Sequence, residues 1–467
     1  MMNNINIIAT SLIFICLFSG TSSKQAFPQA DDPWKAVDTI LRKIKKPLFP
    51  NRIFNISDYG AVNDGRYDCS IAFDHAIKDC HASGGGRVLV PAGRYFTGPI
   101  YLKSHVELHL EKGAEILFST NSKDYLPLVH TRWEGIDLMN YSPLIYAYHE
   151  TDIGITGQGK LNGQASEHNW WTWKGNTSYG WREDMPNQND SARSILFDMG
   201  ERETSLEDRK FGEGFYLRPQ FFQPYYCNNV LIDSVTFVQS PMWILHPVLC
   251  NSVTITNVRV ESHGPNSDGC DPESCKDVLI KNCYFNTGDD CIALKSGRNA
   301  EGRKMNIPCE NIVIQNCTMA NGHGGVVIGS EISGGARNIY AENCYMSSPA
   351  LERAIRIKTS SNRGGTIENL FFRNIKVGQV KEHAIIATMF YEDSGSYVPV
   401  IRNIRIENMS VERGGKYGIL LEGYPDSPVR NVRISHCTIN KAEIPYQFTN
   451  TKDLVLKDVR INGKNIK

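Results

Sequence analysis

The sequence has no excess of charge of either sign. Its 467 residues include 50 Lys plus Arg and 50 Asp plus Glu, so the whole chain has no net attraction for nucleic acid or for a charged membrane surface. Low-complexity stretches are absent too, and the 41% hydrophobic content is enough for a large buried core. We therefore expect neither a nucleic-acid partner nor a membrane partner, and any charged ligand must be bound by a local group of side chains.

Long hydrophobic runs are missing from all but the first part of the chain. The exception runs from Ile5 to Phe18 and is followed by small residues. It is shorter than the roughly 20 residues that cross a bilayer, and its layout is that of a secretory signal peptide. We predict a signal peptide over residues 1–23, an N-terminal extension over 24–53 and one catalytic domain over 54–467, with export to the periplasm or the extracellular space.

Paired C-x-x-C motifs are absent, which argues against a structural zinc site, although the chain has 13 cysteines. Several cysteines instead follow a polar residue at the same place in a recurring segment, where Cys can serve as a small buried hydrophobe. These are Cys283, Cys317, Cys344 and Cys437. We expect stacked thiols in a core rather than a disulfide framework, and we predict no metal and no cofactor.

A short segment of alternating apolar and polar residues recurs through the second half of the chain, as in "VTITNVRV", "VLIKNCYF", "IVIQNCTM" and "NIRIENMSV". Such alternation with β-branched residues is typical of strands. One polar column repeats at intervals of 22 to 34 residues: Asn257, Asn282, Asn316, Asn343, Asn374, Asn408, His436 and Asp458. Units of this size cannot bury a face alone. Stacked as coils of a parallel β-helix they can, and the polar column can hydrogen-bond from coil to coil. Leucine-rich repeats are the competing solenoid, but their leucine-and-helix pattern is absent.

Two segments depart from the repeat. Residues 67–82 place Ile71, Phe73, Ala76 and Ile77 at helical spacing, which predicts a helix that caps the open end of the solenoid. Residues 164–223 are rich in Trp, Tyr, Asn and Gly, and we expect long loops projecting from one side. The predicted fold is therefore all-β: a parallel β-helix with an N-terminal capping helix and long loops on one side.

A second strand follows the first in each coil, and aligning these strands brings charged residues together. "SDGCDPES", "DDCIALKS", "GHGGVVIGS" and "RAIRIKTS" fall into register. In that register Asp268 stacks over Asp290, and Asp289 stands over His323. Neighbouring rungs of a sheet lie about 4.8 Å apart. Carboxylates held one rung apart suppress each other's ionisation, so one can act as an acid while another acts as a base, which are the two roles that glycosidic cleavage needs.

Cations are predicted beside these carboxylates. Arg356 and Lys358 are two residues apart on one strand, so they point to the same face and leave Ile355 and Ile357 for the core. Lys295 is expected to project outward from the neighbouring coil, in the column of Lys358. A guanidinium and an ammonium on a rigid strand suit a substrate carboxylate. The residues together therefore indicate an acidic sugar as substrate.

The ordered motifs "NSDG", "TGDD", "GHGG" and "RIK" closely resemble the signature set of the polygalacturonases of glycoside hydrolase family 28. The resemblance covers roughly Phe54 to the C-terminus. It implies a right-handed parallel β-helix and metal-free, inverting hydrolysis of galacturonic-acid linkages in pectin. It further implies roles by position: Asp289 as general acid, Asp268 with Asp290 activating water, His323 supporting the acid or the leaving group, and Arg356 with Lys358 holding a galacturonate carboxylate.

Three features favour attack at chain ends. The segment 295–312 is longer than in compact endo-acting members, and together with the loops of 164–223 it could block one end of a cleft. The stretch 218–247 resembles exo-acting members and places Trp243 and His246 one coil before Asp268. Ser267, where the family more often has threonine, is a departure that we expect to be harmless. We predict an exo-acting monomer that acts on pectic polysaccharide or oligogalacturonide and binds it through Arg356, Lys358, Lys295, Trp243 and His246.

Other interpretations remain open at this stage. Rhamnogalacturonan hydrolysis is the alternative within the same family. A calcium-dependent pectate lyase also uses a β-helix, and three aspartates could bind calcium through hard oxygen ligands. A non-catalytic β-helix that only binds glycans is the third alternative. Gly-Asp-Asp is also ordinary turn chemistry, and Trp243 and His246 could simply pack under a loop.

Overall fold

The computed structural model describes residues 32–466, except for the side chains of 190 and 191. The predicted signal peptide, residues 1–23, and the first part of the predicted extension lie outside the described residues. Among the residues described, no helix is both long enough and apolar enough to span a bilayer.

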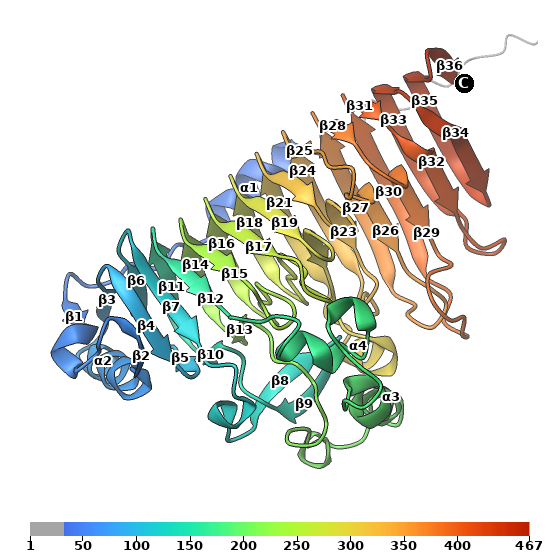
Figure 1. The fold of residues 1–467 in the computed structure, drawn as a ribbon. Helices are drawn as coiled ribbons and strands as arrows, with labels where there is room; N and C mark the ends of the chain where they lie inside the picture. The colour runs from blue at the N-terminus through green and yellow to red at the C-terminus, as the bar shows by residue number, and fades with distance from the viewer. Residues whose placement is uncertain (1–31, 467) are drawn as a thin grey trace, which may run out of the picture.

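The body of the protein is a solenoid in which each coil contributes up to three short strands, and equivalent strands stack as parallel ladders (Figure 1). The first ladder comprises β1 (Ile53–Asn55), β3 (Gly86–Val90), β6 (Val106–Leu110), β11 (Thr151–Gly157), β14 (Asn228–Asp233), β16 (Asn251–Thr256), β18 (Lys276–Lys281), β21 (Cys309–Gln315), β24 (Ala336–Glu342), β27 (Thr366–Arg373), β30 (Val400–Glu407), β33 (Val429–Ile439) and β35 (Thr451–Ile461). The strand β36 (Lys464–Ile466) folds back antiparallel on β35.

In most coils a strand of the second ladder follows one of the first after a short turn, such as Asn282–Cys283 between β18 and β19. It comprises β2 (Asp64–Asp68), β4 (Gly93–Thr97), β7 (Ala114–Phe118), β12 (Lys160–Asn162), β15 (Thr236–Val238), β17 (Arg259–Ser262), β19 (Tyr284–Thr287), β22 (Thr318–Asn321), β25 (Tyr345–Met346), β28 (Lys376–Gln379) and β31 (Ser410–Arg413). It continues through the second half of β33 to the second half of β35.

The third ladder carries the strands that lead into the predicted site. It comprises β5 (Ile100–Tyr101), β10 (Ile145–Tyr148), β13 (Phe222–Tyr225), β20 (Ile292–Leu294), β23 (Val326–Ile328), β26 (Arg353–Lys358), β29 (His383–Thr388), β32 (Gly415–Glu422) and β34 (Ala442–Thr449). Isolated bridges through Leu245 and Cys270 continue it between β13 and β20.

The core is the interior of the solenoid, where aliphatic, aromatic and thiol side chains stack coil upon coil. The predicted cysteine stack is confirmed: Cys283, Cys317, Cys344 and Cys437 are buried free thiols. The Cys317 thiol lies 3.4 Å from the carbonyl oxygen of Gln315 in its own coil. Free thiols therefore serve as core residues here, as the repeat indicated.

The predicted asparagine column is confirmed by side-chain hydrogen bonds. Asn282 donates to Asn257 at 3.3 Å, and Asn316 donates to Asn282 at 3.2 Å. Each of these residues has positive φ, a conformation that asparagine tolerates better than most residues. The polar column thus turns the chain from the first ladder into the second.

A second asparagine ladder, inside the first-ladder strands, was not predicted. Asn338 donates to Asn311 at 3.1 Å, Asn369 donates to Asn338 at 2.9 Å and Asn403 donates to Asn369 at 2.6 Å. All four have positive φ, so each marks a bend in its strand. The recurring Asn-Ile, Asn-Leu and Asn-Val pairs at the starts of these strands were the available signal.

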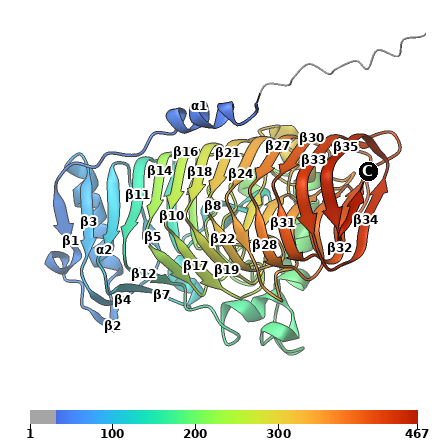
Figure 2. The ribbon, with the colours of Figure 1, turned by 90° about the horizontal axis from the view of Figure 1, so that it is seen from above.

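Two N-terminal helices flank the solenoid. The predicted cap is present as α2 (Ser70–Ala82), which buries Phe73, Ala76 and Ile77, whereas Ile71 is 69% exposed and faces away from the core. The helix α1 (Lys35–Lys43) lies along the outside of the first ladder, against β18 and β21 (Figure 2). Its buried face packs with the residues Val313, Tyr340 and Phe371 of that ladder.

Non-repeated segments gather on one side of the solenoid (Figure 1). The loops predicted over 164–223 contain α3 (Ser194–Glu201), a π-helical turn over Asn189–Arg193, and short 3₁₀ helices, of which Trp170–Lys174 is the longest. The segment 295–312 contributes α4 (Asn299–Met305). An antiparallel hairpin of β8 (Val129–Trp133) and β9 (Ile136–Asn140), which the sequence did not reveal, packs beside them. The remaining 3₁₀ turns are Ile56–Tyr59, Ser122–Tyr125, Thr177–Tyr179 and Leu206–Asp208.

Candidate active site

The charged patch predicted from strand alignment lines a pocket of about 220 Å³ beside the third ladder. The turn from β19 to β20 supplies Asp289 and Asp290, and the segment between β17 and β18 supplies Asp268. The register is the predicted one, because Cys270 bridges Ile292 and the N–H of Gly269 donates to the carbonyl oxygen of Asp290 at 2.9 Å. Strand stacking therefore brings the three carboxylates together.

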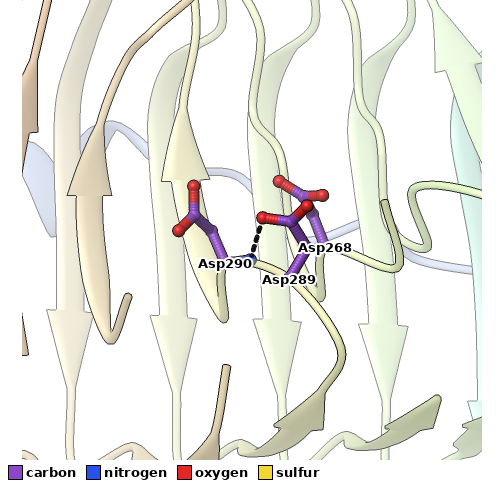
Figure 3. A group of neighbouring side chains, drawn as sticks. All are labelled: Asp268, Asp289 and Asp290. Atoms are coloured by element: carbon purple, nitrogen blue, oxygen red, sulfur yellow. Dashed lines mark hydrogen bonds between the residues drawn. The ribbon is translucent and has the colours of Figure 1, made fainter. Parts of the chain in front are cut away.

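The three aspartates offer carboxylate oxygens that all lie within 4.8 Å of one another. Figure 3 shows the side chains of Asp268 and Asp289 next to each other, with Asp290 directed apart. The backbone N–H of Asp290 donates to Asp289 Oδ1 at 2.9 Å, which fixes that carboxylate within the turn. The adjacent residues Asp289 and Asp290 of the Gly-Asp-Asp turn thus direct their carboxylates in different directions.

Two cations neutralise Asp290. Lys358 Nζ donates to Asp290 Oδ2 at 2.7 Å and Arg356 Nη1 donates to Oδ1 at 3.3 Å. Both cations come from one face of β26, while Ile355 and Ile357 enter the core as predicted.

The predicted column of Lys295 and Lys358 needs one correction. The two residues do not lie on neighbouring coils, because β23 lies between β20 and β26 and places Gly329 in the column. A Cβ at Gly329 would be 2.0 Å from the carbonyl oxygen of Lys358, so only glycine fits there. Lys295 Nζ instead lies 3.7 Å from Asp268, 3.5 Å from Asp271 and 3.2 Å from Glu331.

His323 contacts Asp289 as the alignment suggested. Its Nδ1 lies 2.9 Å from Asp289 Oδ1, and its side chain is 45% exposed. The hydrogen bond that His323 donates to Asp289 and the negative charges of Asp289 and Asp290 raise the pKa of His323 despite partial burial. A protonated imidazole is therefore favoured beside this carboxylate.

The two aromatic residues predicted one coil earlier have different surroundings. Trp243 lines the pocket, and Lys295 Nζ lies over the Trp243 ring, 4.3 Å from its centroid. His246 is fully buried, with Nδ1 2.9 Å from Gln223 and Nε2 2.9 Å from Glu273. The β8–β9 hairpin covers this part of the ladder through bonds to Gln223, so His246 does not reach the pocket and we leave it out of substrate binding.

The pKa values of the carboxylates move in opposite directions. Burial, followed by the negative charges of Asp289 and Asp271, raises the pKa of Asp268 well above its usual range. Burial acts in the same sense on Asp289, but the hydrogen bond and charge of His323 and the charges of Lys358 and Lys295 outweigh it, so its pKa lies below the usual range. For Asp290 the charges of Lys358 and Arg356 likewise outweigh burial and lower the pKa. Neighbouring carboxyls are thus held in different protonation states, as acid–base chemistry requires.

The aspartate cluster has the hard oxygen atoms that calcium binds. Cations of the protein already lie against it, however, with Lys358 and Arg356 at Asp290 and Lys295 at Asp268. A divalent ion at the cluster would have to displace or repel these groups. The donor set by itself therefore fits an acid–base site better than a calcium site.

One end of the pocket is closed by segments outside the repeat. Gly135, at the tip of the β8–β9 hairpin, accepts a 3.1 Å hydrogen bond from the N–H of Arg298, just before α4. Arg298 Nη1 lies 3.5 Å from Glu134 and 3.1 Å from Glu331, and its guanidinium lies 3.9 Å from the ring centroid of Phe197 on α3. We call this contact of the hairpin tip, Arg298 and α3 the closing wall.

Comparison with known proteins decides the family. Residues 212–462, more than half of the chain, match the profile "Glycosyl hydrolases family 28". The chain belongs to this family. Residues 53–110 of this family 28 glycoside hydrolase also match a profile described as "Rhamnogalacturonase A/epimerase, pectate lyase-like". The resemblance drawn from the four ordered motifs is thereby confirmed.

Individual relatives of the family 28 chain carry the names of pectin-degrading enzymes. The crystal structure of a hyperthermoactive exopolygalacturonase from Thermotoga maritima is 44% identical, covers 92% of this chain and 96% of its own, and superposes with a TM-score of 0.90. A probable polygalacturonase from Vitis vinifera is 28% identical over 86% of this chain and 77% of its own. An exo-poly-alpha-D-galacturonosidase from Dickeya chrysanthemi is 26% identical over 74% of this chain and 58% of its own. The predicted fold class, a right-handed parallel β-helix, is confirmed.

Several pocket residues of this family 28 enzyme were missed from sequence. They are Glu134, Lys174, Arg193, Asn266, Ser330, Glu331, Tyr391 and Glu392. Glu331 had a signal, because "GSE" follows β23 in the same register in which "KSG" follows β20. Glu134, Lys174 and Arg193 belong to non-repeated segments, for which strand alignment offers no register.

Proposed function

We propose that this family 28 enzyme hydrolyses galacturonic-acid linkages at the ends of pectic chains, by inverting single displacement. The observation that supports it most directly is the juxtaposition of the carboxyl pair Asp268 and Asp289 with Lys358 in one pocket, next to which Arg356 donates to Asp290. The carboxyls supply acid and base, and the cations can bind the carboxylate of a uronic acid.

In the proposed mechanism Asp289 protonates the leaving oxygen while Asp268 and Asp290 activate water. Asp289 is ionised in the free enzyme, because His323 and Lys358 lower its pKa, so it has to gain a proton in the substrate complex. A substrate carboxylate bound to Lys358 and Arg356 would offset their charge and raise the pKa of Asp289. That proton can come from His323, the protonated partner of Asp289, or from Asp268, whose raised pKa keeps it protonated in the free enzyme and which has to give up its proton before it can act as a base.

Exo action is supported by the closing wall. The contact between Gly135 and Arg298, with ion pairs to Glu134 and Glu331, supports the proposal that a polymer cannot continue past that side. A chain would therefore enter with its end. Trp243 and Lys295 lie on the pocket floor, where they can contact the bound sugar.

Product analysis on polygalacturonate and rhamnogalacturonan, side by side, tests the proposal. We expect monomeric or other single-size galacturonate product from the first minutes on polygalacturonate, with little loss of viscosity per bond cleaved. A ladder of oligomers would contradict exo action, and faster hydrolysis of rhamnogalacturonan would favour the other substrate.

The lyase and the glycan-binding alternatives have distinct outcomes in the same assay. Loss of activity with a chelator, together with ultraviolet-absorbing unsaturated products, would favour a calcium-dependent lyase. Binding without release of reducing ends would favour a glycan-binding protein. We further propose that the enzyme is exported, which the apolar run of residues 5–18 supports, and that it acts as a monomer. Cell fractionation tests export, and size-exclusion chromatography tests the oligomeric state.

A further inference from the structure

A second group of cations, Lys174 and Arg218, lies beside the segment that carries Asp268. Lys174, the last residue of the 3₁₀ helix Trp170–Lys174, lines the pocket, and its Nζ donates to Asn266 Oδ1 at 2.9 Å. Arg218 Nη2 donates to the same oxygen at 2.8 Å. One amide oxygen therefore orients two cations next to the segment that carries Asp268.

Neither of these two cations forms an ion pair with a described carboxylate, although the charges of Glu134 and Asp289 act on both from beyond ion-pair distance. Among the described side chains, Lys174 forms no ion pair, and Arg218 donates to the carbonyl oxygens of Pro241 at 2.8 Å and Pro265 at 2.6 Å. Burial lowers the pKa of Lys174, and burial lowers the pKa of Arg218 to about 10. The other cations in and around the pocket differ, because each of them forms an ion pair with a carboxylate: Arg193, Lys295, Arg298, Arg356 and Lys358.

A cation that is largely removed from water and forms no direct ion pair is stabilised when an anion binds to it. Arg218 is fully buried, and Lys174 is partly buried. Fully buried Arg218 cannot touch a ligand, but Lys174 can, because two of the three ammonium protons remain after the bond to Asn266. The anion must come from the pocket, where the ligand of the proposed function is a uronic acid.

The location of Lys174 relative to the acid pair decides which sugar it meets. Asn266 precedes Asp268 by two residues, whereas Arg356 belongs to a coil three rungs farther along the solenoid, or roughly 14 Å at about 4.8 Å per rung. The carboxyls of Asp289 and Asp290 lie between these two positions. Lys174 also comes from the same loops that build the closing wall. The two groups of cations thus lie on opposite sides of the bond to be cleaved.

We propose that Lys174, oriented by Asn266, binds the carboxylate of the terminal galacturonate unit, on the closed side of the cleaved bond. The inference rests on the proposed function and deepens it, because the enzyme would then bind the carboxylate of a sugar on both sides of that bond. Asn266 and Arg218 act as positioning residues, which hold the ammonium and maintain a positive potential around it.

The test uses digalacturonate and its two singly methyl-esterified forms, one on each sugar unit. An ester cannot form the charge-assisted pair that a carboxylate forms, so each ester reports on one group of cations. We expect Lys174→Met to lower kcat/KM on free digalacturonate by about 10- to 100-fold. The variant should also no longer lose kcat/KM when the unit on the closed side of the cleaved bond is esterified. The penalty for esterifying the other unit should stay unchanged, and Lys174→Arg should retain most of the discrimination.

Lys123→Met, at an exposed lysine outside the pocket, is the matched control and should behave like wild type. The proposal is overturned if Lys174→Met loses the same factor on all three substrates, or if wild-type enzyme hydrolyses the terminally esterified dimer as fast as the free one. That second comparison needs no variant, so it holds even if Lys174→Met fails to fold. Failure of the proposed function looks different, because wild-type enzyme would then cleave none of the three dimers.

Discussion

His323 and Asp289 are joined twice: the imidazole Nδ1 lies 2.9 Å from Asp289 Oδ1, and the backbone N–H of His323 donates to the carbonyl oxygen of Asp289 at 3.1 Å. The backbone bond belongs to the stacking of coils, so the ring is delivered to the carboxylate by the fold itself. The proton between His323 and Asp289 is thus available at the pocket. The neighbouring carboxyl of Asp268 has a raised pKa.

The division of roles between Asp289 and Asp268 can be tested with leaving groups. Asp289→Asn keeps the side-chain shape and removes the proton donor, and we expect kcat on polygalacturonate to fall by at least about 10²-fold. An aryl galacturonide with a good leaving group needs little protonation, so the same variant should lose much less activity on it. Asp268→Asn should lose similar factors on both substrates, because activation of water is needed in either case.

The opposite pattern would contradict the assignment. If Asp268→Asn were rescued by the good leaving group and Asp289→Asn were not, Asp268 would be the acid, in line with its raised pKa in the free enzyme. Binding of a product inhibitor, measured by calorimetry, should survive in both variants and shows that the pocket is intact.

Arg356→Ala and Lys358→Ala should weaken catalysis on polygalacturonate far more than on the methyl-esterified polymer. Hydrogen bonds to charged groups contribute about 1.5 to 3 kcal/mol, so we expect selectivity measured by kcat/KM to fall by about one to two powers of ten. Each single variant leaves Asp290 with one of its two cations, and the melting temperature is the control for folding. Equal losses on both polymers by folded variants would show that these cations do not read the carboxylate.

Asp271→Asn should change the pH dependence of stability. Burial, followed by the negative charge of Asp290, raises the pKa of Asp271 above its usual range, although Lys295 opposes this. The folded protein therefore binds this proton more tightly than the unfolded chain, whose aspartates titrate near pH 3.9. The stability linked to Asp271 is greatest below that pH and falls as the pH rises toward the folded-state pKa.

Asparagine does not titrate, so the variant lacks this pH-dependent loss. We expect the melting temperature of Asp271→Asn minus that of wild type to be more positive at pH 8 than at pH 4. Asp426→Asn, at an exposed residue, serves as the control. A difference that is constant with pH, or that falls with rising pH, would contradict the raised pKa.

Gly135→Ala should open the closed end of the pocket. Gly135 has a φ of +84°, and a Cβ there would be 2.7 Å from the nitrogen of Arg298 and 2.9 Å from its Cβ. The hairpin tip would have to shift, and we expect longer oligogalacturonides among the first products and a faster fall in viscosity per bond cleaved. Gly214→Ala is the matched control, because Gly214 has a φ of +87° with no atom within 4 Å of the added Cβ. Unchanged products from folded Gly135→Ala would show that the closing wall does not determine exo action.

Strand alignment predicted the parts of the site that repeat. Asp268, Asp289, Asp290, His323, Arg356 and Lys358 come from consecutive coils, so a single register places all of them. The same argument placed Lys295 in the correct column but one coil too close to Lys358, because the coil of β23 contributes only a glycine, Gly329, to that column.

The closed end of the pocket could not be predicted in the same way. The β8–β9 hairpin and the loops that carry Lys174 and Arg193 have no periodicity, and their places depend on contacts between residues far apart in sequence, such as Gly135 with Arg298. His246 was misplaced for the same reason: its ladder position is outward, but the hairpin buries it. Long-range packing of irregular segments leaves no pattern in a single sequence.

Helix α1 makes the solenoid less modular than its repeats suggest. In a stack of coils each coil contacts only its neighbours, so unfolding can spread from either end. The buried face of α1, with Trp34, Val37 and Ile40, packs on Val313, Tyr340 and Phe371 from three successive first-ladder strands. The chain segment before the first coil thus contacts the middle of the stack. We expect this contact to couple unfolding of the N-terminal coils to that of the central ones, whereas the last coils beyond β27 lack it.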